Sequence, residues 1–314
     1  MMRLPKDFLK GSIPPLITPF RNGKVDYDAY ARLVEFQVKS GSHGILVNGT
    51  TSEPSTLTVE ERNRIVDVAI EAVRGKVPII AATGSQSFAE TEVLTKHAEA
   101  AGADALLIVT PYYNKPSPEG LYRHFCTVAE SVDCSIVVYN VPGRTGTNIT
   151  PEVLTRLAFV PNIVGVKEAS GDLEQMCQVC RDMTDNFSVL SGDDVYTLAM
   201  VAMGAVGVIS VASNEVPSEM AELVDAALAG DFLAARATHE RLFPLMQINF
   251  VESNPIPVKA ALAEMGLMSA HYRLPLVVPQ EPSRRRIAEV LRDLGLLNGV
   301  PRKSPSGGPV SSET

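Results

Sequence analysis

The sequence has no excess of basic residues and no long hydrophobic run. Its 28 lysines and arginines are outnumbered by 36 aspartates and glutamates, which gives a formal net charge of -8 at pH 7. Nucleic acid is not an expected partner, because binding a phosphate backbone requires a basic face. No apolar run approaches the length of a membrane span, and a lysine interrupts the opening stretch MMRLPKDFLKGSIPP. We therefore expect a cytoplasmic protein that has no membrane partner.

Cysteine is also scarce, with four residues in the chain. Cys177 and Cys180 form a C-x-x-C pattern, which in other settings indicates a redox or zinc site. Here the pattern lies in GDLEQMCQVCRDM, which has helical periodicity, and no second pair of cysteine or histidine ligands stands nearby. We interpret the pair as cysteines on a helix face and expect neither a disulfide nor a structural zinc ion.

Eight short apolar runs, by contrast, recur along the chain at a spacing of about 25 to 30 residues. They are IPPLIT, GILVNG, VPIIAATG, DALLIVTP, SIVVYNVP, NIVGVKE, FSVLSGDD and AVGVISV. Near-continuous apolar runs are typical of strands that are buried on both faces of a parallel sheet. With 314 residues, 45% of them hydrophobic, the chain is long enough for one large barrel or about two ordinary domains.

Segments with helical periodicity separate these runs. Thr58 and Glu61 form a capping box at the start of one segment, and Gly75 and Gly102 stand where helix C-caps are expected. Eight repeats of strand then helix predict an α/β fold, a (β/α)8 TIM barrel. A doubly wound sheet is the alternative, but it more often has a glycine-rich turn after the first strand, and PPLITPF has none.

Helical patterns alone follow the eighth unit. They are DFLAARATHERLFPLMQ, NPIPVKAALAEMG and PSRRRIAEVLRDLG. We therefore divide the chain into a barrel at 9–230, with its active site at the carboxyl ends of the strands, and a three-helix extension at 231–299. The last segment, 300–314, is rich in proline, glycine and serine, and we expect it to be disordered.

The functional face of such a barrel is the one where its strands end. The motifs expected there are TPF, NGTTSE, TGS, TPYYN, YNVPGRTG, KEASG, SGDD and SNE. They are rich in hydroxyl groups and small residues, and they contain one lysine and one arginine. The five histidines are scattered outside these motifs, and no carboxylate cluster of metal-ligand type occurs, so we expect no metal.

Lys167 ends the apolar run NIVGV. A lysine without a metal, surrounded by hydroxyls, fits Schiff-base chemistry, because desolvation lowers the pKa of an amine and leaves it able to attack a carbonyl. The simpler interpretation is a strand-end lysine that meets water. Lys115 in a loop and Lys259 on an appended helix are weaker candidates. Glu168 points the other way along the strand, so we assign it a structural role.

Neighbouring strand ends offer groups that would support such a lysine. The hydroxyl of Tyr139 could relay a proton to and from an imine, although a packed aromatic is the simpler interpretation. The tripeptide GTT at 49–51 offers two hydroxyls and the amides of a turn as a cradle for a small carboxylate. Arg144 offers a fork for a second carboxylate, although a loop arginine is more often a surface group.

Together these stretches resemble the dihydrodipicolinate synthase and N-acetylneuraminate lyase family, pyruvate-dependent class I aldolases on a (β/α)8 barrel. The resemblance runs from about Leu9 to about Leu297 and is closer to the synthases than to the lyases. Its motifs are GTTSE, TPYYNKPSPEGLYRHF, YNVPGRTG, GVKEASGD, SGDD and GVISVASN. It implies that pyruvate condenses with aspartate β-semialdehyde to give 4-hydroxy-tetrahydrodipicolinate for lysine and diaminopimelate biosynthesis. It also implies a covalent lysine imine without a metal or other cofactor.

The resemblance also assigns roles to single residues. Lys167 would form the imine, and the proton relay would consist of Thr50, Tyr139 and Tyr113. Tyr113 would reach into the active site of a neighbouring subunit, so a homo-oligomer of at least two subunits is implied, and the family favours a tetramer that is a dimer of dimers. The substrate-binding residues implied are Thr51 for the pyruvate carboxylate, Arg144 for the carboxylate of the aldehyde, Gly192 and Ile209.

Two features depart from the usual synthase pattern. Synthases usually carry a glycine where this chain has Ser52 (GTTGE rather than GTTSEP), and a side chain and a following proline there could reshape the carboxylate cradle and change the aldehyde that is used. In lysine-inhibited members, the end product binds near Ser55, Val59, Arg62, Gln86, Glu90 and Tyr112. Histidines common at two of these positions are Val59 and Arg62 here, so we expect feedback inhibition by lysine to be weak or absent.

Two other functions compete with the synthase. A sibling aldolase or dehydratase would use the same imine with a sugar-derived 2-keto acid, but such lyases generally lack the arginine of GRTG, which is Arg144 here. A non-catalytic paralogue that binds a small acid would have lost the nucleophile or the relay, whereas Lys167, Tyr139 and Thr50 are present. The sequence therefore favours the synthase.

Overall fold

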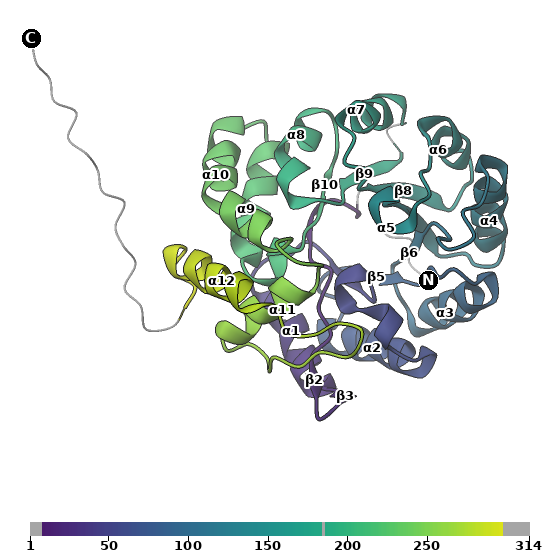
Figure 1. Ribbon diagram of the computed structural model, residues 1–314. Coiled ribbons are helices and arrows are strands. Elements are labelled where there is room, and N and C mark those ends of the chain that lie inside the picture. Colours follow the sequence, from purple (N-terminus) through teal and green to yellow (C-terminus); the bar gives the residue numbers. More distant parts are fainter. Residues whose placement is uncertain (1–7, 184–185, 298–314) are drawn as a thin grey trace, which may run out of the picture.

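A parallel eight-stranded sheet forms the centre of the computed structural model, which describes residues 8–183 and 186–297 (Figure 1). The strands are β1 Gly11–Ile13, β4 Ile45–Val47, β5 Ile79–Ala82, β6 Ala105–Val109, β7 Ser135–Asn140, β8 Ile163–Glu168, β9 Ser188–Ser191 and β10 Gly207–Ile209. Their order is β1-β10-β9-β8-β7-β6-β5-β4. The ring closes where Leu46 receives a backbone hydrogen bond from Leu16 and donates one to Pro14, both at 2.9 Å. The predicted barrel is confirmed. Seven of the eight predicted apolar runs contain a strand, whereas β1 ends at Ile13, where the run IPPLIT begins.

Helices surround the barrel because each strand is followed by an amphipathic segment whose apolar side packs on the sheet. They are α1 Tyr27–Lys39, α2 Val59–Val73, α3 Phe88–Ala101, α4 Pro118–Glu130, α6 Pro151–Leu157, α7 Leu173–Asp182, α8 Thr197–Ala202 and α9 Pro217–Leu228. The helix pattern CQVC lies on α7, and all four cysteines of the chain, which fall within the described residues, are free thiols.

Helix ends follow the local signals closely. The capping box of Thr58 and Glu61 is present at the start of α2, and Gly102 caps α3 with a left-handed φ of 99°. The prediction for Gly75 was wrong by one residue. Arg74 is the C-cap of α2, because its own backbone adopts the left-handed conformation with φ of 52°.

A small antiparallel hairpin, β2 Phe20–Arg21 and β3 Lys24–Val25, was not predicted. Each of its strands has only two residues, too few to produce a recognisable alternation of apolar and polar side chains. Phe20 is nevertheless buried, so the hairpin covers part of the core.

The helices expected after residue 230 are α10 Phe232–Ile248, α11 Ile256–Glu264 and α12 Glu281–Asp293. They lie together on one side of the barrel (Figure 1). Apolar side chains of α9, α10, α11 and α12 share one buried cluster with Val208 of β10. The extension is thus packed on the barrel. The expected disordered segment 300–314 lies outside the described residues.

Within the described ranges 8–183 and 186–297, none of the helices combines the length and apolar character that crossing a membrane would require.

Candidate active site

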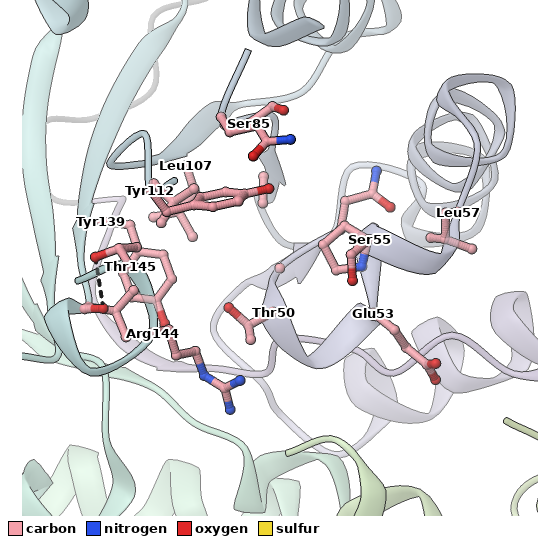
Figure 2. A pocket seen from close by; sticks show the side chains of 18 of the residues that line it. Thr50, Glu53, Ser55, Leu57, Ser85, Leu107, Tyr112, Tyr139, Arg144 and Thr145 are labelled. Carbon is pink, nitrogen blue, oxygen red and sulfur yellow. Dashed lines mark hydrogen bonds between the residues drawn. The ribbon is translucent and has the colours of Figure 1, made fainter. Parts of the chain in front are cut away.

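Two adjoining cavities of about 520 and about 100 Å³ open where the strands end. Thr50, Tyr139, Val141, Arg144 and Asn254 line both of them. Figure 2 shows the larger cavity, with Thr50 and Arg144 projecting from different segments of the chain toward the same space. The carboxyl ends of parallel strands meet at one face of a barrel, so motifs far apart in the sequence come together here.

Lys167 lies near the end of β8, in register with Tyr139 of β7, and lines the smaller cavity. It is only 4% exposed, and its Nζ lies 4.2 Å from the centroid of the Tyr139 ring. Among the residues that the structure describes, no carboxylate forms an ion pair with this amine. A buried amine that has no carboxylate partner is well placed to react with a small carbonyl compound in the cavity.

The lysine stem has room because a glycine faces it. A Cβ on Gly192 would lie 3.1 Å from Cε of Lys167 and 2.6 Å from Cβ of Ala169, closer than side-chain carbons pack. Gly192 also lines the smaller cavity, and its N–H donates to the carbonyl of Glu168 at 2.7 Å. A side chain at position 192 would therefore displace the lysine.

Thr50 and Thr51 stand on the 3-10 turn Thr50–Ser52 that follows β4, and both line the smaller cavity. The hydroxyl oxygen of Thr51 accepts a hydrogen bond of 3.0 Å from Nδ2 of Asn254. Asn254 belongs to the segment that leads into α11, so the helical extension contributes directly to the site.

The Ser52 side chain does not enter this cradle, whereas the following proline, Pro54, lines the larger cavity, and the effect of this departure on the aldehyde that is used stays a prediction. Ser52 is fully buried and lines neither cavity. Its hydroxyl donates to the carbonyl of Leu16 at 2.5 Å, and its own carbonyl accepts from the hydroxyl of Thr18 at 2.8 Å. The side chain therefore ties the turn to the segment after β1 and points away from the substrate space.

Arg144 lies on the short helix α5 Pro142–Thr145 and lines both cavities. One guanidinium nitrogen, Nη2, donates to the carbonyl oxygen of Asn254 at 3.3 Å. No described carboxylate forms an ion pair with Arg144. Its remaining N–H groups are therefore free to bind a carboxylate from a ligand.

Two residues assigned to the site by resemblance do not line these cavities. Tyr113 is 89% exposed on the loop after β6. Ile209 is buried inside the barrel, in the same apolar cluster as Tyr139 and Leu190. Within the chain, then, the structure brings together Lys167 and Tyr139 with the remaining predicted site residues Thr50, Thr51, Arg144 and Gly192.

Glu168 has the structural role that its position on the strand predicted. Its side chain is buried and accepts hydrogen bonds from Nδ2 of Asn140 at 3.0 Å and from the N–H of Ser170 at 2.7 Å. The carboxylate thus fastens the end of β8 to β7 and to the following loop, which holds Lys167 in place.

Two acids, Asp193 and Asp194, follow β9 and lie near enough to Lys167 to interact with its charge. Burial raises the pKa of Asp194 to about 6, opposed by hydrogen bonds from Ser210 and the Ala212 N–H and by the charge of Lys167. Burial also raises the pKa of Asp193, which lines the smaller cavity. Among the described residues no group of three or more histidines, cysteines or acids is arranged to hold a metal ion.

Sequence reasoning missed a buried ion pair between Glu53 and Lys259, and with it the contribution of Asn254. Lys259 is fully buried on α11 and bonds to the carboxylate of Glu53, which follows the Thr50–Ser52 turn. Burial lowers the pKa of Lys259, and the charge of Glu53 opposes that shift. A lysine inside the apolar run IPVKAALA was the available signal, because a buried ammonium requires an acidic partner.

Arg62 occupies one of the positions associated with lysine inhibition. It is 4% exposed, its Nη1 lies 3.2 Å from Oε1 of Glu90, and its Nη2 donates to the carbonyl of Ala82 at 3.2 Å. Both residues line the larger cavity. Glu90 is thus already paired within the chain.

Comparisons of the sequence and of the structure with known proteins both match this chain to one family. The model of the dihydrodipicolinate synthetase family matches residues 8–294. The 4-hydroxy-tetrahydrodipicolinate synthase of Syntrophus aciditrophicus is 52% identical over 288 residues, which cover 92% of this chain and 99% of that protein.

Solved structures of similar proteins also superpose on the barrel. The dihydrodipicolinate synthase from Aquifex aeolicus is 45% identical, with a TM-score of 0.91 over 92% of this chain and 100% of that chain. The chloride-inhibited enzyme from Acinetobacter baumannii, solved in complex with pyruvate, is 42% identical, with a TM-score of 0.90 over 92% of this chain and 100% of that chain.

Proposed function

The chain belongs to the dihydrodipicolinate synthetase family, and from this we infer that it is a lyase of the 4-hydroxy-tetrahydrodipicolinate synthase type. It condenses pyruvate with aspartate β-semialdehyde in lysine and diaminopimelate biosynthesis. The observation that carries the assignment is a buried, unpaired Lys167 at a cavity that also presents Thr51 and Arg144.

In this mechanism the amine of Lys167 adds to the ketone of pyruvate, and the carbinolamine loses water to give an imine. Loss of a proton from the pyruvate methyl group gives an enamine, whose carbon adds to the aldehyde. The amino group of the adduct then displaces Lys167 as the ring closes, which returns the free amine. No metal or other cofactor is needed, because the imine itself accepts the electron pair, and we expect a chelator to leave turnover unchanged.

Each step moves a proton, and hydroxyl groups near the lysine would carry it. Tyr139 is next to Lys167 across the sheet, and Thr50 lines the same cavity. We assign the relay to these two residues and to Tyr113 of a neighbouring subunit, whose exposure of 89% leaves it available for such a contact. This assignment requires at least a dimer, and we propose a tetramer that is a dimer of dimers.

Two carboxylates must also be held in place. We assign the pyruvate carboxylate to the Thr51 hydroxyl and neighbouring amides, and the carboxylate of the semialdehyde to the fork of Arg144. Gly192 leaves room for the imine beside the lysine stem. Ile209, which is buried inside the barrel, would limit the depth of the substrate cavity beside Lys167.

End-product inhibition should be weak in this protein. Where a free lysine would need the carboxylate of Glu90, Arg62 already pairs with it at 3.2 Å. We propose that lysine leaves the rate nearly unchanged at concentrations up to millimolar. An inhibition constant in the micromolar range would contradict this. The cytoplasmic location remains a prediction from the sequence.

The deciding experiment is pyruvate-dependent consumption of aspartate β-semialdehyde by the purified protein, with Lys167→Ala as the control. Turnover that disappears in the variant supports the synthase. If pyruvate can still be trapped on Lys167 with borohydride but the semialdehyde is not consumed, the enzyme is instead an aldolase for sugar-derived 2-keto acids.

A further inference from the structure

Asn254 makes contact with both proposed carboxylate-binding residues. Its side-chain Nδ2 donates to Oγ1 of Thr51 at 3.0 Å, and its main-chain carbonyl accepts from Nη2 of Arg144 at 3.3 Å. It is 5% exposed and lines both cavities. It lies between α10 and α11, more than 200 residues from Thr51 in the sequence.

The direction of the first hydrogen bond decides what Thr51 can do. An amide NH2 group only donates, so Oγ1 of Thr51 must be the acceptor, and its own hydrogen remains to be donated elsewhere. No described residue accepts that hydrogen, and Thr51 lines the cavity of Lys167. A carboxylate bound in the cavity would provide the acceptor.

A second residue of the C-terminal extension, Lys259, also holds the turn that carries Thr51. Glu53, at the end of the Thr50–Ser52 turn, has a left-handed backbone with φ of 53° and is bonded through its carboxylate to Lys259. Oδ1 of Asn254 has no hydrogen-bond partner among the described residues, so only the amide nitrogen ties this side chain to the turn. The helical extension therefore holds the turn at two points.

We propose that Asn254 is a positioning residue of the carboxylate site, which commits the Thr51 hydroxyl to donate to pyruvate and holds Arg144 through its carbonyl. The proposal rests on the proposed function, since it takes pyruvate as the ligand. It gives the C-terminal extension a role in substrate binding. Asn254 itself takes no part in the covalent chemistry.

The test measures the pyruvate concentration that gives half-maximal borohydride trapping on the full-length protein. Asn254→Ala removes the donor to Thr51. The half-saturating pyruvate concentration should then rise about tenfold, which is the usual effect of losing one hydrogen bond that orients a group binding a charged ligand. The maximal trapped fraction at saturating pyruvate should stay at the wild-type value, because Lys167 is untouched. A merely structural residue would instead change both quantities together.

Asn254→Asp is the sharper variant, because it preserves the shape of the side chain. The carboxylate would take the hydrogen of Thr51 and repel the carboxylate of pyruvate, so half-maximal trapping should need about 100-fold more pyruvate. The matched control is Glu281→Gln, which breaks an exposed ion pair with Arg285 in the same extension and should change nothing. An unchanged half-saturation in Asn254→Asp would overturn the proposal.

A double-mutant cycle separates positioning from direct contact with the substrate. In a Thr51→Val background, Asn254→Ala should raise the half-saturating pyruvate concentration by less than about twofold, because Asn254 acts through the hydroxyl that is already missing. Full additivity would overturn the proposal. If the wild-type chain traps no pyruvate at all, the proposed function itself fails, so the two failures are distinguishable.

Discussion

Two buried lysines lie near the Thr50–Ser52 turn, and their surroundings differ. Lys167, at the barrel rim, is 4% exposed, faces the ring of Tyr139 and forms no ion pair with a described carboxylate. Lys259 lies on α11, where the extension packs against the barrel, and it is fully buried and bonded to Glu53. Its Nζ lies 4.4 Å from the centroid of the Phe20 ring.

The difference shows that burial alone does not make a lysine a nucleophile. At Lys259 the carboxylate of Glu53 satisfies the ammonium and there is no space for a substrate, so the residue holds two parts of the fold together. At Lys167 a cavity takes the place of the carboxylate. The same side chain is therefore held in an ion pair in one region, whereas in the other it faces a cavity, where we propose that it is catalytic.

The largest effect should come from Lys167→Ala. The rate of semialdehyde consumption should fall by about 10⁴-fold or more, because the covalent route is lost. The free energy of unfolding should change little, since no described carboxylate loses an ion-pair partner. Urea titration and the mass of borohydride-treated protein test both statements. Retained pyruvate trapping would place the nucleophile elsewhere.

Lys259→Met should give the opposite result. The free energy of unfolding should drop by about 3–5 kcal/mol, because Glu53 would remain buried without its counter-charge. The double variant Lys259→Met, Glu53→Gln should recover much of this loss, and both variants should still form the pyruvate imine on Lys167 where they remain folded. Urea titration of the three proteins provides the comparison. A Lys259→Met variant as stable as the wild type would show that the pair is unimportant.

Asp194→Asn tests an acid near Lys167 that is not paired with it. Its pKa of about 6 in the folded protein exceeds that of an unfolded aspartate, so the folded state binds its proton more tightly. The free energy of unfolding should therefore fall by roughly 2 kcal/mol as the pH rises from about 4 to about 6. Asp194→Asn should remove that fall, which urea titrations at several pH values would detect. Parallel pH profiles would contradict the prediction.

Arg144→Ala separates binding from covalent chemistry at the rim. Pyruvate trapping on Lys167 should persist, whereas kcat/KM for the semialdehyde should fall by about 100-fold, since the fork to its carboxylate is lost. Arg144→Lys should recover only part of this, because a lysine cannot bind a carboxylate with two parallel hydrogen bonds. Unchanged kinetics with the semialdehyde would remove Arg144 from its role.

The sequence predicted much of the rim correctly. Apolar runs fixed which residues enter the sheet, and the end of each run placed Lys167, Tyr139, Thr50 and Arg144 at one face. These properties are local, since a strand ends where its apolar pattern ends and parallel strands all end on the same side. Single-residue errors such as the Gly75 cap arose where a neighbour could adopt the same backbone conformation.

The contacts between the barrel and the C-terminal extension could not be predicted in the same way. The Glu53–Lys259 and Thr51–Asn254 contacts join residues 206 and 203 positions apart. Each also depends on where α11 packs against the barrel, which no local pattern specifies. The position of the Ser52 side chain could not be predicted for the same reason, since its partner, the carbonyl of Leu16, lies 36 residues earlier.

The sequence by itself therefore determined the barrel and which side chains stand at its strand ends, because periodicity and strand polarity act over a few residues. Only the tertiary structure decided which buried lysine is paired and which groups orient the carboxylate site. Those outcomes depend on charges and hydrogen bonds between distant segments, whose partners meet only after the core has packed.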